Sequence, residues 1–203
     1  RGVEYIELRC VDLNPFSPLG ITDSQIRFLD VFALYCLLED SPALTEQEQQ
    51  CNIENLQSIV TQGRDPQLRL TSKCTQAPFR QWAQEHLQKM LQVAQLFDQA
   101  HGHSAHSGVV KAQMQKLAQP ELTPSAQVMT TLFEQQQPFF EFAMNRAQDT
   151  ANYFKNQPLS SAEAAAFTKE ARRSIEAQRR IEAEDDITFE QYLDNFFAQD
   201  ACN

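Results

Sequence analysis

The first stretch of the chain alternates between apolar and polar side chains, as a β-strand does. It is also rich in β-branched and aromatic residues, so the pattern predicts a strand over Val3–Asp12. Successive side chains of a strand point to opposite faces. One face, mostly apolar, carries Glu4, Ile6, Leu8 and Cys10. The other carries Tyr5, Glu7 and Arg9. We expect the first face to pack on a core and the second to line something polar, although a sheet with one solvated face would also explain Glu7 and Arg9.

The rest of the chain has the apolar spacing of helices. The run Ser24–Leu38 is apolar nearly all round, which predicts a central buried helix behind the strand, against Ile6 and Leu8. Phe79–Ala100 is amphipathic, with Leu96 widening its apolar face. Before the amphipathic helix, the pattern predicts a helix starting at Thr45, a helix over Ile53–Thr61 and a short strand over Leu68–Thr71. After it, further helices are predicted over Val109–Ala118, Pro124–Gln136, Pro138–Phe154 and Ser160–Glu184. A last helix follows Thr188, and we expect its aromatic stripe to dock on the body.

These patterns predict an α+β fold that is predominantly helical. We expect two parts, a strand with a proline-rich turn over residues 1–20 and a single helical region over residues 21–203. The net charge of −10 argues against a nucleic-acid or anionic-membrane partner, because both require a positive surface. No apolar run approaches the roughly 20 residues that span a bilayer, and no secretory signal is present.

The five cysteines do not form a disulfide scaffold or a zinc-binding pattern. Reduced, partly buried thiols are the default interpretation. Cys51 and Cys74 nevertheless lie near the ends of predicted elements, and a disulfide between them is the alternative. It would close a loop of about 23 residues, for which the chain-entropy treatment gives roughly 3 kcal/mol.

Three histidines, His101, His103 and His106, follow the long amphipathic pattern within a glycine-containing stretch. Neutral imidazole is a common metal ligand, so the group invites a metal-site interpretation. The spacing matches neither a helical pair nor a strand, and no Cys or carboxylate flanks it closely. A flexible polar loop accounts for it better.

The residues after the predicted strand form a rigid exit with two prolines and a glycine, Leu13–Gly20. The run from Glu4 to Gly20 is E-Y-I-E-L-R-C-V-D-L-N-P-F-S-P-L-G. It closely resembles a segment of the bacterial glutamate–cysteine ligases of the type found in enteric bacteria. The resemblance continues more weakly through Phe28–Asp30 and the helical remainder. Asp12 and Asn14 are interpreted as structural residues whose short side chains bond their own backbone in the turn.

The resemblance implies a glutamine-synthetase-like ligase fold, in which this strand belongs to an antiparallel sheet curled into a funnel. It implies that Glu7 is a ligand of a divalent metal, Mg²⁺ or Mn²⁺, and that Arg9 is a catalytic residue that contacts the transferred phosphate. Tyr5 is a possible pocket wall, with a packing role as the alternative. The alternation derived above places these three side chains on one face, about 7 Å along the strand between Glu7 and Arg9, which agrees with that arrangement.

The implied reaction joins the γ-carboxylate of L-glutamate to the amine of L-cysteine with ATP as co-substrate, the first step of glutathione biosynthesis. The chain opens at Arg1 without an initiating Met, so we expect a C-terminal part of a longer cytoplasmic enzyme that is monomeric at full length. Alone it should be inactive, because its partner is the N-terminal part of the same polypeptide. The alternatives are a related ATP-dependent ligase that uses another amine and a helical interaction domain without catalysis.

Overall fold

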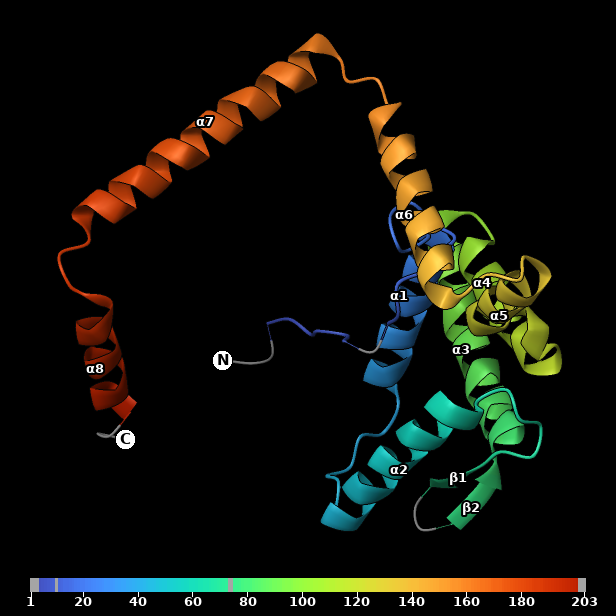
Figure 1. Ribbon diagram of the computed structural model, residues 1–203. Coiled ribbons are helices and arrows are strands. Elements are labelled where there is room, and N and C mark those ends of the chain that lie inside the picture. Colours follow the sequence, from blue (N-terminus) through green and yellow to red (C-terminus); the bar gives the residue numbers. More distant parts are fainter. Residues whose placement is uncertain (1–3, 10, 73–74, 201–203) are drawn as a thin grey trace. The chain divides into compact units, whose positions relative to one another are not determined.

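The computed structural model describes residues 4–9, 11–72 and 75–200, and it is mostly helical (Figure 1). The chain divides into two compact units, Arg1–Asn152 and Tyr153–Asn203. The predicted boundary after Gly20 stays a prediction. The elements are α1 (Asp23–Leu38), α2 (Glu46–Gln62), β1 (Arg69–Ser72), β2 (Thr75–Pro78), α3 (Phe79–His101), α4 (Ala105–Ala118), a 3-10 turn (Pro120–Leu122), α5 (Pro124–Glu134), α6 (Phe139–Lys155), α7 (Ser161–Glu184) and α8 (Phe189–Asp200).

The core of the first unit forms where α1, α3 and α4 pack side by side (Figure 1). The predicted apolar face of α3 is confirmed, and Met90 and Ala94 are among its buried residues. Leu96, which was expected to widen that face, is exposed instead. The buried cluster consists of Val31, Tyr35, Leu87, Met90, Val93, Ala94 and Val110. Because these side chains come from three helices, the core fixes their mutual packing.

Helix α1 begins where the sequence predicted. The Thr22 hydroxyl accepts a hydrogen bond from the Gln25 backbone N–H at 3.2 Å, and the Gln25 side chain accepts from the Thr22 N–H, which completes a capping box. Its expected burial on all sides is wrong, because Val31 and Tyr35 are its buried residues while Leu37 is exposed. α1 therefore covers the core with one face only.

Residues 4–9 lie outside any helix or strand, so the strand predicted over Val3–Asp12 is not formed in the described part of the chain. Ile6 and Leu8 are 67% and 41% exposed, and the expected packing of both on α1 is wrong. A strand requires a neighbour that takes up its backbone hydrogen bonds. In the described residues the only paired strands are β1 and β2, which pair with each other.

The proline-rich exit forms a compact turn that fixes where the N-terminal segment meets α1. The Asn14 N–H donates to the Gly20 carbonyl at 2.7 Å, and the Asn14 side chain accepts from the Phe16 N–H, which confirms its structural role. Gly20 has φ +71°, and a Cβ there would lie 2.8 Å from Leu13. Phe16 contacts Phe142 of α6 edge to face, with ring centroids 6.1 Å apart.

The predicted strand Leu68–Thr71 is confirmed as β1, and it forms an antiparallel hairpin with β2 in the register Arg69↔Pro78 and Ser72↔Thr75. The two helices expected between Thr45 and Thr61 are one continuous helix, α2, which starts at the Thr45 capping box. Asn55 of α2 clamps the hairpin, because its amide donates to the Thr71 carbonyl at 2.7 Å and its carbonyl accepts from the Thr71 N–H at 2.8 Å.

The corner between α3 and α4 is tighter than the sequence indicated. Gly102 ends α3 in the left-handed conformation with φ +70°, and α4 already begins at Ala105, so His106 is helical and not part of a loop. Asp98 of α3 caps α4 by accepting the backbone N–H groups of His106 and Ser107 at 2.9 and 3.0 Å. Burial alone would raise the pKa of Asp98, but the hydrogen bonds from Ser107 and His106 outweigh it and hold that pKa well below its usual range.

The second unit consists of the end of α6, α7 and α8. Helix α7 begins as predicted after Ser160, whose side chain accepts from the Glu163 N–H in a capping box. Along α7 the described side chains are largely exposed. The aromatic stripe of α8, with Phe189, Tyr192 and Phe196, is exposed within this unit, and its docking on the body stays a prediction. None of the described helices has the length and apolar character that crossing a membrane requires.

The packing of α3 makes a direct prediction for stability. We expect Met90→Ala to lower the free energy of unfolding by about 2–5 kcal/mol, because Met90 is 3% exposed and its removal leaves a cavity in the three-helix core. The control is Leu96→Ala on the same helix, which is 58% exposed and should change stability by less than about 0.5 kcal/mol. Urea unfolding measures both, and equal losses would contradict this account of the core.

Candidate functional site

Glu7 and Arg9 lie on the same side of the extended N-terminal segment. The Arg9 Nη2 atom is 2.8 Å from Glu7 Oε2, and the two side chains are 83% and 58% exposed, respectively. This contact agrees with the alternation inferred from the sequence. Such an exposed ion pair contributes only about 0–1 kcal/mol to stability. Each of the two side chains can therefore leave this pair and bind another charged group at little cost. Tyr5 is also exposed, and no described side chain closes a pocket wall around it.

The turn that follows this segment borders a cavity. Residues 12–15 and 17–20, together with side chains of α5 and α6, line a space of about 600 Å³. Glu7, Arg9 and Tyr5 are not among its lining residues. The structure therefore brings Glu7 and Arg9 together but does not enclose them.

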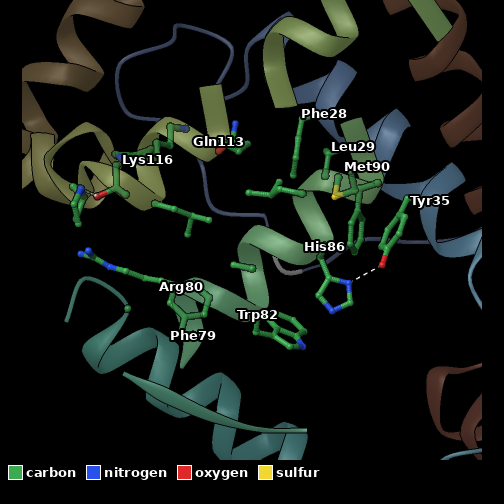
Figure 2. A pocket seen from close by; sticks show the side chains of 18 residues that line it. Phe28, Leu29, Tyr35, Phe79, Arg80, Trp82, His86, Met90, Gln113 and Lys116 are labelled. Atoms are coloured by element: carbon green, nitrogen blue, oxygen red, sulfur yellow. Dashed lines mark hydrogen bonds between the residues drawn. The ribbon is translucent and has the colours of Figure 1, made fainter. Parts of the chain in front are cut away.

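A second cavity, of about 670 Å³, lies over the three-helix core (Figure 2). Side chains of α1, α3 and α4 line most of it, and they are mainly apolar. Figure 2 shows Arg80 and Lys116 toward one side of the cavity and the Tyr35–His86 pair toward the other. Burial lowers the pKa of Lys116 from its usual value.

Tyr35 and His86 link α1 to α3 at this cavity. The Tyr35 hydroxyl lies 2.6 Å from His86 Nδ1 (Figure 2). Burial, followed by the nearby Glu39 charge, raises the pKa of Tyr35, so its hydroxyl keeps its proton at neutral pH and we assign it as the donor. Trp82 stacks edge to face against His86 with centroids 4.5 Å apart.

The described lining of this cavity has no Asp, Glu or Cys. It can accept an apolar group and pair an anion with Arg80 or Lys116. It offers no carboxylate for metal binding and no thiol nucleophile. We therefore treat this cavity as a binding space and the Glu7–Arg9 segment as the candidate for phosphate chemistry.

The remaining sequence-based site prediction concerns the cysteines. Cys51 is described with a free thiol and lies on α2. Cys74 lies outside the described residues, so the disulfide between them stays a prediction.

Sequence reasoning missed one cluster, formed by Asp98, His103 and His106. The histidines had been noted, but the carboxylate comes from the preceding helix and was not recognised as a neighbour. Asp98 is four residues after Ala94 on α3, so it lies on the same face of the helix as that buried residue. A carboxylate on the apolar face of α3 was the signal in the sequence that could have indicated the cluster.

Comparison with known proteins places the chain near one family. Residues 1–59, which contain Glu7 and Arg9, match the family model described as glutamate-cysteine ligase. A glutamate–cysteine ligase of Pseudomonas fluorescens is 39% identical over 193 residues, which is 95% of this chain and 36% of that protein. The enzyme of Alcanivorax borkumensis is 40% identical over 197 residues, 97% of this chain and 38% of that protein.

A solved structure extends the similarity to the fold. The glutamate–cysteine ligase of Francisella tularensis, crystallised in complex with AMP, aligns with a TM-score of 0.87 and 25% identity. The alignment covers 99% of this chain and 39% of that one. The chain thus spans somewhat more than a third of the length of the relatives that it matches.

The Tyr35–His86 contact predicts a loss of stability when the hydroxyl is removed. Tyr35→Phe should lower the free energy of unfolding by about 1–3 kcal/mol, because His86 Nδ1 loses its partner in a partly buried setting. Tyr153→Phe is the control, since the Tyr153 side chain is exposed and should change stability by less than about 0.5 kcal/mol. Thermal or urea unfolding decides, and a Tyr35→Phe protein as stable as the control would refute the assignment.

Proposed function

We propose that this chain is the C-terminal part of a glutamate–cysteine ligase and acts in ATP-dependent formation of γ-glutamylcysteine, the first step of glutathione biosynthesis. The observation that carries the proposal is the similarity to glutamate–cysteine ligases over 95–97% of the chain. The family model covers the segment with the two candidate residues. In such a reaction the γ-carboxylate of glutamate attacks the terminal phosphorus of ATP, which releases ADP. The cysteine amine then attacks the γ-glutamyl phosphate and displaces phosphate.

Arg9 would stabilise the transferring phosphoryl group. Its negative charge is spread over several oxygens in the transition state, and a planar guanidinium donates two parallel hydrogen bonds to such a group. The ion pair with Glu7 is exposed and weak, so Arg9 can exchange it for phosphate oxygens. Tyr5, on the same side by alternation, would line the wall beside them.

Glu7 would hold a divalent cation, Mg²⁺ or Mn²⁺. Its exposed carboxylate offers the oxygen ligands that these ions prefer, and Mg²⁺ commonly takes one or two protein carboxylates with phosphate oxygens and water. Glu7 therefore fits part of such a site. When bound, the metal would neutralise phosphate charge that otherwise repels the incoming carboxylate.

The rest of the site would come from the part of the polypeptide that the longer relatives contain and this chain does not match. Strands from that part would pair with residues 3–12 and complete a funnel-like antiparallel sheet, as in the enteric type of ligase. This proposal explains why residues 4–9 are extended and exposed in the described structure. The 203 residues alone would be inactive. The intact enzyme would be a cytoplasmic monomer.

The first experiment measures ADP release with ATP, Mg²⁺, L-glutamate and L-cysteine. The intact polypeptide should turn over and require cysteine, and the 203-residue chain should not. Activity with another amine and none with cysteine would move the proposal to a related carboxylate–amine ligase. No ADP release by the intact polypeptide would leave a helical interaction domain as the better interpretation.

Replacing the guanidinium tests the role of Arg9. In the intact polypeptide, Arg9→Lys should reduce kcat by at least about a hundredfold with little change in KM, because the charge stays while the two parallel donors are lost. Arg27→Lys changes another arginine, which pairs with Asp23 at 2.6 Å, and should keep kcat within about twofold. Wild-type turnover in Arg9→Lys would remove Arg9 from the mechanism.

A metal titration tests the role of Glu7. Glu7→Gln should raise the Mg²⁺ concentration that gives half-maximal activity by about tenfold or more, because an amide oxygen binds the cation more weakly than a carboxylate. The neighbouring Glu4→Gln removes a carboxylate from the opposite side of the segment and should leave the titration unchanged. If the Glu7→Gln curve overlays that of the wild type, Glu7 is not a metal ligand.

A further inference from the structure

The corner between α3 and α4 gathers three potential metal ligands that have no part in the proposed reaction. Asp98 belongs to α3, His103 to the connection and His106 to the first turn of α4. One ligand atom from each lies within 4.8 Å of the others. Asp98 Oδ1 is 3.4 Å from His103 Nδ1 and 3.3 Å from His106 Nδ1.

His106 points to a missing partner. The residue is 7% exposed, and among the described residues no hydrogen bond reaches its buried Nδ1 atom. A protonated Nδ1 would be expected to donate to Asp98 Oδ1, yet no hydrogen bond joins the two atoms. An unprotonated Nδ1 would be a buried acceptor beside a carboxylate oxygen, which offers it no proton. A cation between them resolves both difficulties, because each atom then donates its lone pair to the ion.

His103 is already in the form that binds a metal. Its Nδ1 accepts a long hydrogen bond of 3.3 Å from the Ala105 N–H, so this nitrogen carries no proton. A metal ion could bind the Nδ1 lone pair in place of the long hydrogen bond from the Ala105 N–H. The carboxylate is ionised as well, because its capping hydrogen bonds favour the charged form.

The two spacings from Asp98 fit four-coordinate geometry, while the ligand atoms of the two histidines lie within 4.8 Å of each other. With metal–nitrogen and metal–oxygen bonds of about 2.0–2.2 Å, two ligands of a tetrahedral site lie roughly 3.3–3.5 Å apart. Both distances from Asp98 Oδ1, 3.3 and 3.4 Å, fall at this value. The larger Ca²⁺ and the hydrated Mg²⁺ prefer all-oxygen ligands, whereas two imidazoles with a carboxylate favour Zn²⁺ and similar first-row ions.

We propose that Asp98, His103 and His106 form a site for a divalent transition metal, with Zn²⁺ the best match and water as the fourth ligand. The site would join the end of α3 to the start of α4 beside the core. Binding to the folded state alone would stabilise that corner by mass action. This inference does not depend on the proposed ligase activity.

The competing explanation is that Asp98 serves only as a helix cap. The two imidazoles would then interact with it merely as nearby rings, stacked with centroids 5.2 Å apart. His101 offers a matched control for that explanation. Its ring also stacks on His103, but its Nδ1 is 2.9 Å from the Phe97 carbonyl and it is not part of the three-ligand group.

The test uses the intact polypeptide after removal of metal with a chelator. Zn²⁺ affinity is measured by calorimetry, and Co²⁺ serves as a spectroscopic probe because its visible absorption is far stronger in four-coordinate sites than in six-coordinate ones. Two variants are compared with the wild type, His103→Gln and His101→Gln. His103 is partly exposed, so its replacement should leave the fold intact. Thermal unfolding without metal verifies this for both variants.

We expect Co²⁺ to give the four-coordinate spectrum in the wild type and in His101→Gln, and Zn²⁺ to raise the melting temperature of both. His103→Gln should lose the four-coordinate spectrum and bind Zn²⁺ at least about tenfold more weakly. Loss of a residue that only supports a metal ligand already lowers metal affinity by about this factor, and His103 would be a ligand itself. Absence of a four-coordinate spectrum in the wild type overturns the proposal. Equal losses in the two variants also overturn it, because exposed imidazoles would then bind the metal without Asp98 and His106.

Discussion

The packing of α1 and α4 onto the apolar stripe of α3 is the interaction on which the first unit depends. Met90 and Ala94 of α3 and Val110 of α4 are buried at this junction, and Tyr35 of α1 adds a hydrogen bond to His86. The cavity of Figure 2 is lined by all three helices, and the Asp98–His103–His106 cluster lies where two of them, α3 and α4, meet. Loss of buried side-chain volume on α3, as at Met90, would therefore loosen the helix that carries residues of both sites.

The candidate phosphate site has a different physical basis. A helix satisfies its backbone hydrogen bonds internally, whereas a strand depends on a neighbour. Residues 4–9 have no strand partner in the described structure, and the exposed side chains of Glu7 and Arg9 form an ion pair with each other. Under the proposed function the same residues would gain a strand partner, so assembly of the sheet and assembly of the active site would be one event.

Local patterns in the sequence were sufficient for much of the helical fold. The helix starts at Thr45 and Ser160 and the amphipathic period of α3 were predicted because their partners lie within a few residues. The errors involve distant partners. Ile6 and Leu8 were expected to be buried, but burial of these side chains would need a neighbouring layer, and both are exposed. For the candidate site, the alternation of side chains predicted that Glu7 and Arg9 lie on the same side of the segment. At the corner between α3 and α4, no local pattern in the sequence shows that Asp98 reaches His106.

The cap that Asp98 provides also has a consequence for the order of folding. The first turn of α4 obtains its hydrogen-bond acceptor from α3, so nucleation of α4 becomes favourable only after the last turns of α3 are in place. The connection is short and Gly102 sets its direction, which keeps the loop-closure entropy small. The two helices should thus form as one hairpin, in which α4 depends on α3 for its cap.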